Sequence, residues 1–114
     1  MQNKVLTKAT AHFKIALASE MSQIEVPEWE TTVYYRPAIT LAQQTKVLEF
    51  HNKGKLVDAL VETLIVRARH EDGKPMFQSG ERQIIINEVD PDVLTRIVTE
   101  MNVGSNKAEA ELGN

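Results

Sequence analysis

Apolar residues recur along this chain at two different spacings, and the changes of spacing mark the elements that we predict. Spacings of three and four residues, which give a helix one apolar face, occupy most of its 114 residues. The clearest such run lies in residues 55–70, and its apolar positions are Val57, Leu60, Val61, Leu64, Ile65 and Ala68. We expect this helix to lie at the centre of the hydrophobic core.

Two further helices are predicted before it. Residues 7–21 carry a narrower apolar stripe, and their first residue is a threonine, which is a favourable N-cap. Residues 40–53 begin with Thr40 and Gln43 at the spacing of a capping box, in which each side chain binds the other residue's backbone N–H. Gly54 follows and favours a helix end, because glycine adopts left-handed backbone conformations without steric cost.

The closing helix is predicted from residue 90 to Gly104. Asp90 is a strong N-cap, and Pro91 suits the first helical position, where a backbone N–H is not needed. The apolar stripe of this helix consists of Val93, Leu94, Ile97, Val98 and Met101. Residues 105–114 are polar and carry no pattern, so we expect one domain over residues 1–104 and a flexible polar tail over residues 105–114.

The segment between the central and closing helices begins with a predicted turn. Residues 71–75 contain an Asp-Gly pair, which tolerates positive φ, and end with Pro75, which prevents the helix from resuming. Ser79 can cap a short helix that carries three consecutive isoleucines. Consecutive β-branched residues suit a strand equally well, so residues 81–88 are predicted as a helix with a strand as the alternative.

Residues 23–36 alternate apolar and polar side chains, which is the period of a strand. We expect a hairpin in which residues 23–26 pair with residues 32–36 and the chain turns through residues 27–30. A single strand after an aromatic loop is the alternative, because Pro27 cannot donate to a ladder. The predicted fold class is therefore α+β, a mostly α-helical single domain with a small β-hairpin or strand element near residues 23–36.

The same element holds the only tryptophan and both tyrosines of a chain that is poor in aromatic residues. Aromatic and arginine side chains are the types that most often anchor protein interfaces. We therefore select Trp29, Tyr34, Arg36 and Phe77 as candidate partner-binding residues. Packing of Trp29 on the central helix is the alternative, because a core with few aromatics would use its large apolar area. Tyr34 and Tyr35 point to opposite sides of a strand, so one of them must face solvent or a partner.

Composition and charge argue against several classes of function. The chain has no cysteine, which excludes disulfides, thiolate metal sites and cysteine nucleophiles. Its three histidines lie on separate predicted helices without a partner at metal-binding spacing, so we predict no catalytic, metal or cofactor site and no enzyme activity. A net charge of −3 gives no basic face for nucleic acid or an anionic membrane. No apolar run is long enough to span a membrane, and we expect a soluble intracellular protein.

Four motifs occur in order between residues 24 and 103: VPEW at residues 26–29, VYYR at 33–36, EDGKPMF at 71–77 and VDPDVLTRIV at 89–98. Together they resemble the tail assembly chaperones of long-tailed, non-contractile bacteriophages, the siphophage or lambda-like family. Glu30 and Thr31 depart from the family pattern, which usually has two glycines at these positions.

This resemblance implies a non-enzymatic protein in the host cell cytoplasm that binds the tail tape measure protein, keeps it soluble and helps to recruit the major tail tube protein. It also implies that copies of the chaperone associate with one another and leave before the virion is complete. The candidate surfaces are the Trp29–Arg36 element and the spare faces of the helices over residues 40–53 and 90–102. A permanent structural component of the virion, such as a head–tail connector or a tail completion protein, is the alternative.

Overall fold

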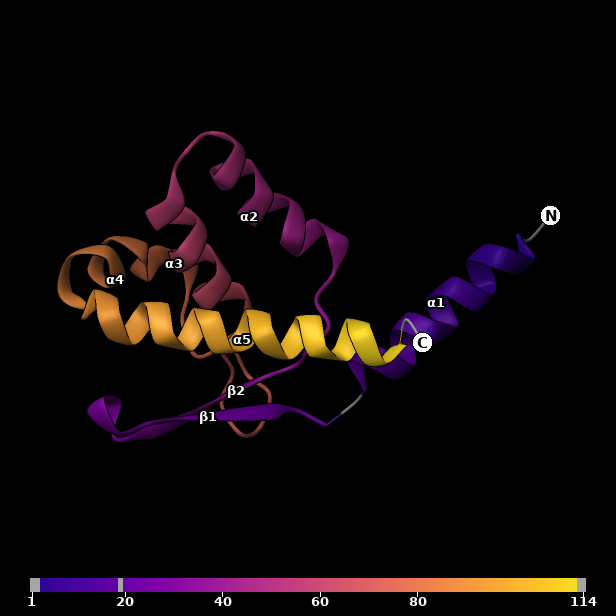
Figure 1. The fold of residues 1–114 in the computed structure, drawn as a ribbon, viewed down its shortest axis with the longest axis horizontal. Helices are drawn as coiled ribbons and strands as arrows, with labels where there is room; N and C mark the ends of the chain where they lie inside the picture. The colour runs from indigo at the N-terminus through magenta and orange to yellow at the C-terminus, as the bar shows by residue number, and fades with distance from the viewer. Residues whose placement is uncertain (1–2, 19, 113–114) are drawn as a thin grey trace.

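The chain forms five α-helices, two 3-10 helices and one antiparallel hairpin over residues 3–18 and 20–112, the part that the computed structural model describes (Figure 1). In chain order the elements are α1 (Lys4–Leu17), β1 (Ser22–Val26), η1 (Pro27–Trp29), β2 (Thr31–Tyr35), α2 (Leu41–Asn52), α3 (Leu56–Arg67), η2 (Ser79–Glu81), α4 (Arg82–Glu88) and α5 (Pro91–Leu112). The predicted α+β class and its mostly helical content are confirmed.

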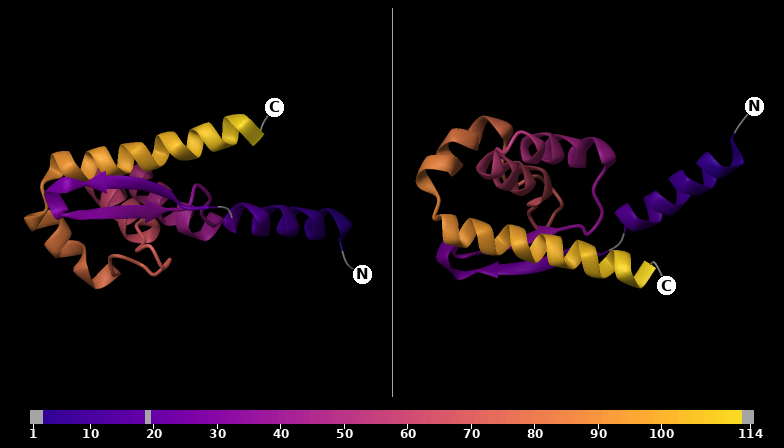
Figure 2. Two further views of the ribbon diagram at one scale, coloured as in Figure 1. Left: turned by 90° about the horizontal axis from the view of Figure 1, so that it is seen from below. Right: turned by 45° about the horizontal axis from the view of Figure 1, so that its top comes forward.

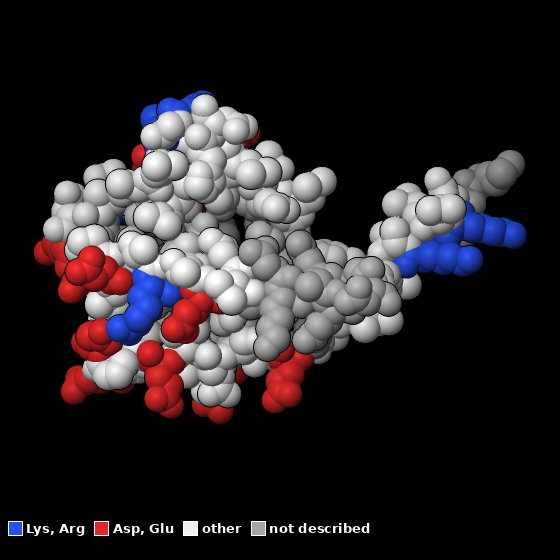
Figure 3. All heavy atoms as spheres, in the orientation of Figure 1, with Lys and Arg blue, Asp and Glu red and all other residues white. Residues whose placement is uncertain are grey.

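The elements form a packed body with one projecting arm. α3 packs against α2, α4 and α5, and the hairpin lies beside α5 (Figure 1 and Figure 2). α1 extends away from this body and contributes no buried residue. Acidic side chains gather around the hairpin and the start of α5, whereas lysines follow α1 (Figure 3). The two parts of the molecule therefore differ in charge as well as in packing.

The hydrophobic core is built from the apolar stripes that periodicity predicts. α3 and the residue after it contribute Ala59, Val61, Leu64, Ile65 and Ala68. α5 contributes Val93, Leu94, Ile97, Val98 and Met101. The central position predicted for the helix of residues 55–70 is confirmed, although Val57 near its start is exposed.

The hairpin closes one side of this core. Ile24 lies opposite Val33, and these two side chains are buried together with Val26 and Tyr35. The outer face of the hairpin carries Gln23, Glu25, Thr32 and Tyr34, none of which is buried. The hairpin prediction is confirmed and the single-strand alternative is wrong, because the two strands pair along their whole length.

β2 has a further backbone partner on its other edge. Tyr34 donates its N–H to the Arg69 carbonyl at 3.0 Å, and Arg69 donates its own N–H to the Tyr34 carbonyl at 2.7 Å. The predicted helix over residues 55–70 is therefore too long, because the chain becomes extended at Ala68 to make this bridge. The predicted turn follows and reverses the chain at Gly73, which has a φ of 87°.

Local capping chemistry fixes two helices where the sequence predicts it. Gln43 N–H donates to Thr40 Oγ1 at 3.2 Å, and Thr40 N–H donates to Gln43 Oε1 at 3.0 Å, which completes the capping box of α2. Gly54 follows α2 in the left-handed conformation, with a φ of 73°. Asp90 Oδ1 accepts the N–H of Asp92 at 2.9 Å and so caps α5.

The first helix differs from its prediction at both ends. Asn3 is the N-cap instead of Thr7, since Asn3 Oδ1 accepts the N–H groups of Val5 at 3.0 Å and Leu6 at 3.1 Å. The helix ends at Leu17 rather than at residue 21, because the chain from residue 22 onward pairs in β1. α1 is therefore shifted toward the N-terminus.

The two last helices contain further differences. Residues 82–88 are helical, which confirms the helix prediction and excludes the strand, but Gln78 instead of Ser79 caps the turn that leads into α4. α5 continues through Gly104 to Leu112, so the helix end predicted at Gly104 is wrong. One glycine costs a helix only about 1 kcal/mol, and the alanines, glutamates and lysine that follow favour helix. The division into a domain of residues 1–104 and a flexible tail of residues 105–114 stays a prediction.

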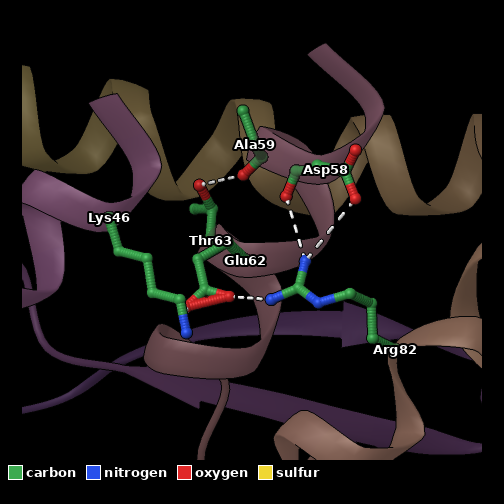
Figure 4. A network of polar contacts seen from close by, with 6 residues as sticks. All are labelled: Lys46, Asp58, Ala59, Glu62, Thr63 and Arg82. Carbon is green, nitrogen blue, oxygen red and sulfur yellow. Dashed lines mark hydrogen bonds and ion pairs between the residues drawn. The ribbon is translucent and has the colours of Figure 1, made fainter. Parts of the chain in front are cut away.

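A buried ion-pair network joins α2, α3 and α4 (Figure 4). The Glu62 side chain of α3, which is 4% exposed, pairs with Arg82 of α4 and lies 3.6 Å from Lys46 Nζ of α2. Arg82 Nη1 also donates to the Asp58 carbonyl at 3.4 Å, and its guanidinium lies 5.2 Å from the centroid of the Phe50 ring. A carboxylate buried this deeply requires such partners. The network therefore holds three helices together beside the apolar core.

Candidate partner-binding surface

Trp29 and Phe77 contact each other. Trp29 ends η1, and Phe77 lies between the 71–75 turn and η2. Their ring centroids are 6.0 Å apart and their planes make an angle of 76°, which is an edge-to-face contact. Both side chains are half-buried and pack against the core. Trp29 therefore packs against the core, and its role in binding a partner stays a prediction, which concerns the part of the ring that remains exposed.

An ion pair fixes the turn of the hairpin to α5. Arg96 Nη1 and Nη2 donate to the two carboxylate oxygens of Glu28 at 2.7 and 2.9 Å. These hydrogen bonds favour the charged carboxylate and lower the pKa of Glu28 from 4.5 to about 2. The same contact raises the pKa of Arg96. Because Glu28 directly precedes Trp29, the pair joins the short segment that carries the indole to α5.

Tyr34 lies on the outer face of the hairpin, directly opposite Gln23. Tyr35 is buried instead, and its hydroxyl donates to the Glu100 carbonyl at 3.4 Å. The prediction that one of the two tyrosines faces outward is confirmed. Tyr34 lines an open hollow of about 540 Å³ together with Thr31, Thr32, His70, Glu71 and Asp72. An aromatic ring and two carboxylates therefore line this hollow.

Arginine side chains gather where β2 ends. Arg36, Arg67 and Arg69 all line a second hollow, of about 150 Å³, beside the start of α2. Arg67 is buried, and its Nη2 donates to the carbonyl oxygens of Arg36 at 3.2 Å and Pro37 at 3.4 Å. Its guanidinium lies 5.4 Å from the centroid of the Tyr35 ring, and burial lowers its pKa. Arg67 thus supports the backbone that carries Arg36.

The Arg36 side chain reaches over the 71–75 turn. A β-carbon built on Gly73 would lie 3.6 Å from Arg36 Nη2, so the guanidinium lies close above that glycine. Among the described residues, no ion pair joins Arg36 or Arg69 to a carboxylate. The guanidinium of Arg36, a half-buried residue, can therefore donate hydrogen bonds to a carboxylate of another molecule.

The four candidate residues fall into two groups. Trp29 and Phe77 are in contact at the core, whereas Tyr34 and Arg36 lie at the end of β2 beside the 71–75 turn. The sequence interpretation missed Arg69, whose backbone bridge to Tyr34 holds this second group together. No periodicity signals a bridge of one residue, and the apolar pattern of the helix itself continues through Ala68.

Over residues 3–18 and 20–103, whose side chains the structure describes, no three His, Asp or Glu side chains are grouped so that they could hold a metal ion. None of the helices in the same part of the chain has the length and hydropathy needed to cross a bilayer.

These observations define a small α+β domain with a helical core, an extended arm and a polar, aromatic surface beside its hairpin. Comparison with models of protein families finds no match, and comparison with curated proteins finds none. Among solved structures, the chain matches the bacteriophage HK97 tail assembly chaperone with a TM-score of 0.60 and 21% sequence identity. The match covers 82% of this chain and 92% of that chain. At this level of identity it shows a shared fold, which is the fold of the family that the sequence motifs resemble.

Proposed function

We propose that this protein is a phage tail assembly chaperone, which binds the tail tape measure protein, keeps it soluble and helps to recruit the major tail tube protein. The observation that carries the proposal is the fold shared with the HK97 chaperone over 82% of the chain. The ordered motifs between residues 24 and 103 support it independently of the coordinates. In this role the protein acts without catalysis or a cofactor, in the host cell cytoplasm, and it is absent from the finished virion.

The proposed mechanism is reversible covering of apolar helix faces. A tape measure protein that is not yet enclosed by the tail tube exposes long apolar stripes, and such surfaces aggregate. This chain offers half-exposed Tyr34 and Arg36 beside the hollow of the hairpin. It also exposes Leu41 and Leu48 on α2, which lie seven residues apart and therefore on one helix face. Several copies that associate with one another would cover one long partner.

Tyr34 is the best residue for testing this binding surface, because Trp29 and Phe77 also support the core. We expect co-expression of the chain with the tape measure protein of the same phage to move that protein into the soluble fraction. Tyr34→Ser removes the outward aromatic ring and should return most of the tape measure protein to the pellet. Gln23→Ser, at the position opposite Tyr34, is the matched control, and with this variant the tape measure protein should stay soluble.

Both variants must melt at the same temperature as the unmodified chain, because a difference in tape measure solubility then reports on binding and not on unfolding of the variant. If the tape measure protein is equally soluble with Tyr34→Ser and with Gln23→Ser, Tyr34 is not part of the binding surface. The unmodified chain could instead fail to change the solubility of the tape measure protein and be detected by mass spectrometry in purified virions. Those two results together would support the alternative, in which the chain is a permanent structural component of the virion.

A further inference from the structure

The small hollow of about 150 Å³ beside the end of β2 is strongly basic, although the chain as a whole is acidic. Arg36, Arg67 and Arg69 line it, and the other described residues around it are uncharged. The lining therefore carries a formal charge of +3 in a chain whose net charge is −3. Like charges around one hollow repel each other, and an anion between them removes that repulsion. We call this site the arginine hollow.

Two of the three guanidinium groups keep hydrogen-bond donors for a ligand. Arg69 Nη2 donates to the carbonyl of Val66, another lining residue, at 3.3 Å. A guanidinium has five N–H donors, so this bond leaves Arg69 able to bind an anion. Arg36 reaches over Gly73, whose built β-carbon would lie 3.6 Å from Arg36 Nη2. In the part of the chain that the structure describes, no ion pair joins Arg36 or Arg69 to a carboxylate.

Arg67 makes the positive charge of the arginine hollow a fixed feature of the fold. It is 5% exposed, and its Nη2 donates to the carbonyl oxygens of Arg36 and Pro37. The backbone at the end of β2 thus holds this guanidinium in place. A cation that is shielded from water attracts an anion more strongly than an exposed one does. An anion that enters the hollow would therefore be bound by more than a screened surface charge.

The remaining walls of the arginine hollow indicate which kind of anion fits. Leu17, Ile39 and Val66 line it with apolar side chains. Thr40 and Gln43 place the start of α2 on the same hollow, and a helix start carries partial positive charge. Apolar walls beside fixed positive charge suit an anion on an apolar stem, which describes a glutamate or aspartate side chain. Inorganic phosphate has no apolar part that could contact these walls.

We propose that the arginine hollow binds the carboxylate of a glutamate or aspartate side chain from a partner polypeptide. A guanidinium matches a carboxylate well, because two parallel N–H groups can donate to its two oxygens. The inference rests on the proposed function, in which that polypeptide is the tape measure protein. An acidic residue at the edge of an apolar helix stripe would enter the hollow, and the stripe would cover the apolar residues beside it. Arg36 and Arg69 would then select which segments of the partner are bound.

The first test is a titration of the purified full-length chain with N-acetylglutamate amide, which carries a glutamate side chain and no other charge. NMR spectra of the arginine Nε–Hε groups report the binding. We expect the signals of Arg36 and Arg69 to shift and saturate, whereas that of Arg96, which is paired with Glu28, should stay in place. N-acetylglutamine amide has nearly the same shape without the charge and is the matched control. Ionic strength is held constant, so that screening is the same in both titrations.

A substitution within the arginine hollow checks that the shifts arise there. Arg36→Gln should weaken binding of N-acetylglutamate amide, followed at Arg69, by about tenfold, because it removes a charged hydrogen-bond donor. Lys53→Gln removes the same charge at an exposed residue outside the hollow and should leave the affinity unchanged. The titration of the unmodified chain decides the matter even if a variant is unstable.

Co-expression with the tape measure protein tests the source of the carboxylate. Arg36→Gln/Arg69→Gln should return most of the tape measure protein to the pellet. Lys53→Gln/Lys55→Gln changes the net charge equally at exposed positions and should keep it soluble. Both double variants must melt at the same temperature as the unmodified chain, so that the comparison reports on binding.

Several results would overturn the proposal. Shifts that do not saturate, or that are equal with the glutamine compound, would mean that the hollow is no carboxylate site. Tighter binding of inorganic phosphate than of N-acetylglutamate amide would assign the hollow to phosphate instead. A tape measure protein that stays soluble with Arg36→Gln/Arg69→Gln would exclude it as the source. Because the titration uses this chain alone, its failure is distinguishable from a failure of the unmodified chain to solubilise the tape measure protein.

Discussion

Glu30 has a backbone conformation that its side chain does not favour. Its φ of 52° and ψ of 40° lie in the left-handed region, between the end of η1 and the start of β2. A residue with a β-carbon crowds the following carbonyl oxygen there, at a cost of about 1–2 kcal/mol. Glycine avoids this cost, and two glycines are usual at positions 30 and 31 in the family that the sequence motifs resemble. The pairing of β1 with β2 on both sides of the turn holds Glu30 in this conformation.

We predict that Glu30→Gly stabilises the protein. Relief of the left-handed strain exceeds the extra chain entropy that glycine loses on folding, so the free energy of unfolding should rise by about 0.5–1 kcal/mol. Urea denaturation followed by circular dichroism measures it. Glu25→Gly is the control, because Glu25 lies within β1, and it should lower stability by about the same amount. A lower stability for Glu30→Gly would mean that its side chain contributes contacts that outweigh the strain.

Capping residues show how far single residues can be interpreted from sequence. Thr40 and Asp90 were predictable as caps, because each is the best capping side chain within its turn and its partner lies at the required spacing. At α1, Asn3 and Thr7 lie one turn apart and both suit an N-cap. The choice depends on where the chain can start the helix, which capping preference alone does not determine.

At the scale of elements, the Glu62 network decides how α2, α3 and α4 stay together. Glu62 is buried, and its pairing with Arg82 compensates for the loss of hydration. Lys46 approaches the same carboxylate, but its side chain is 57% exposed and its contribution is screened by water. The two basic partners of one carboxylate should therefore differ widely in their effect on stability.

We predict that Arg82→Met destabilises the protein by about 3 kcal/mol, because it leaves the buried Glu62 carboxylate without its main partner. Lys46→Met should cost less than about 1 kcal/mol, as expected for an exposed partner. Urea denaturation curves of the two variants give both values. Adding Glu62→Leu to Arg82→Met should recover stability, since the uncompensated charge is then removed. Equal losses in the two single variants would contradict the assignment of Arg82 as the main partner.

The elements themselves were largely predictable, and their tertiary relations were not. Periods of 3.6 and 2 residues located α3, α5 and the hairpin, because each buries one face. The bridge between Tyr34 and Arg69 has no such signal, since one residue on an extended chain has no period. The contact between Trp29 and Phe77 was likewise invisible, because it depends on how the hairpin packs relative to the 71–75 turn. That Trp29, Tyr34, Arg36 and Phe77 bind a partner therefore stays a prediction, and the structure adds that they lie in two separate groups.

For the whole molecule, the remaining question is where the folded unit ends. The last buried residue that the structure describes is Met101, and the two residues after it are exposed. α5 nevertheless continues to Leu112, over a segment that is mostly polar. Helix continuation and participation in the core are separate properties, since a polar helix end can extend into solvent without packing on the body. The predicted boundary between the domain of residues 1–104 and the tail of residues 105–114 therefore concerns where packing on the core ends, and not where the helix ends.

We predict that a chain ending at Gly104 unfolds at nearly the same urea concentration as the full chain, with a loss of free energy of unfolding below about 0.5 kcal/mol. The physical reason is that the deletion removes helical residues beyond the buried stripe of α5 and leaves Val93 to Met101 in place. Met101→Ala is the control, because it removes a fully buried side chain and should cost about 2–4 kcal/mol. If the shortened chain loses as much as Met101→Ala, residues 105–114 pack on the body, and the folded unit includes the whole of α5.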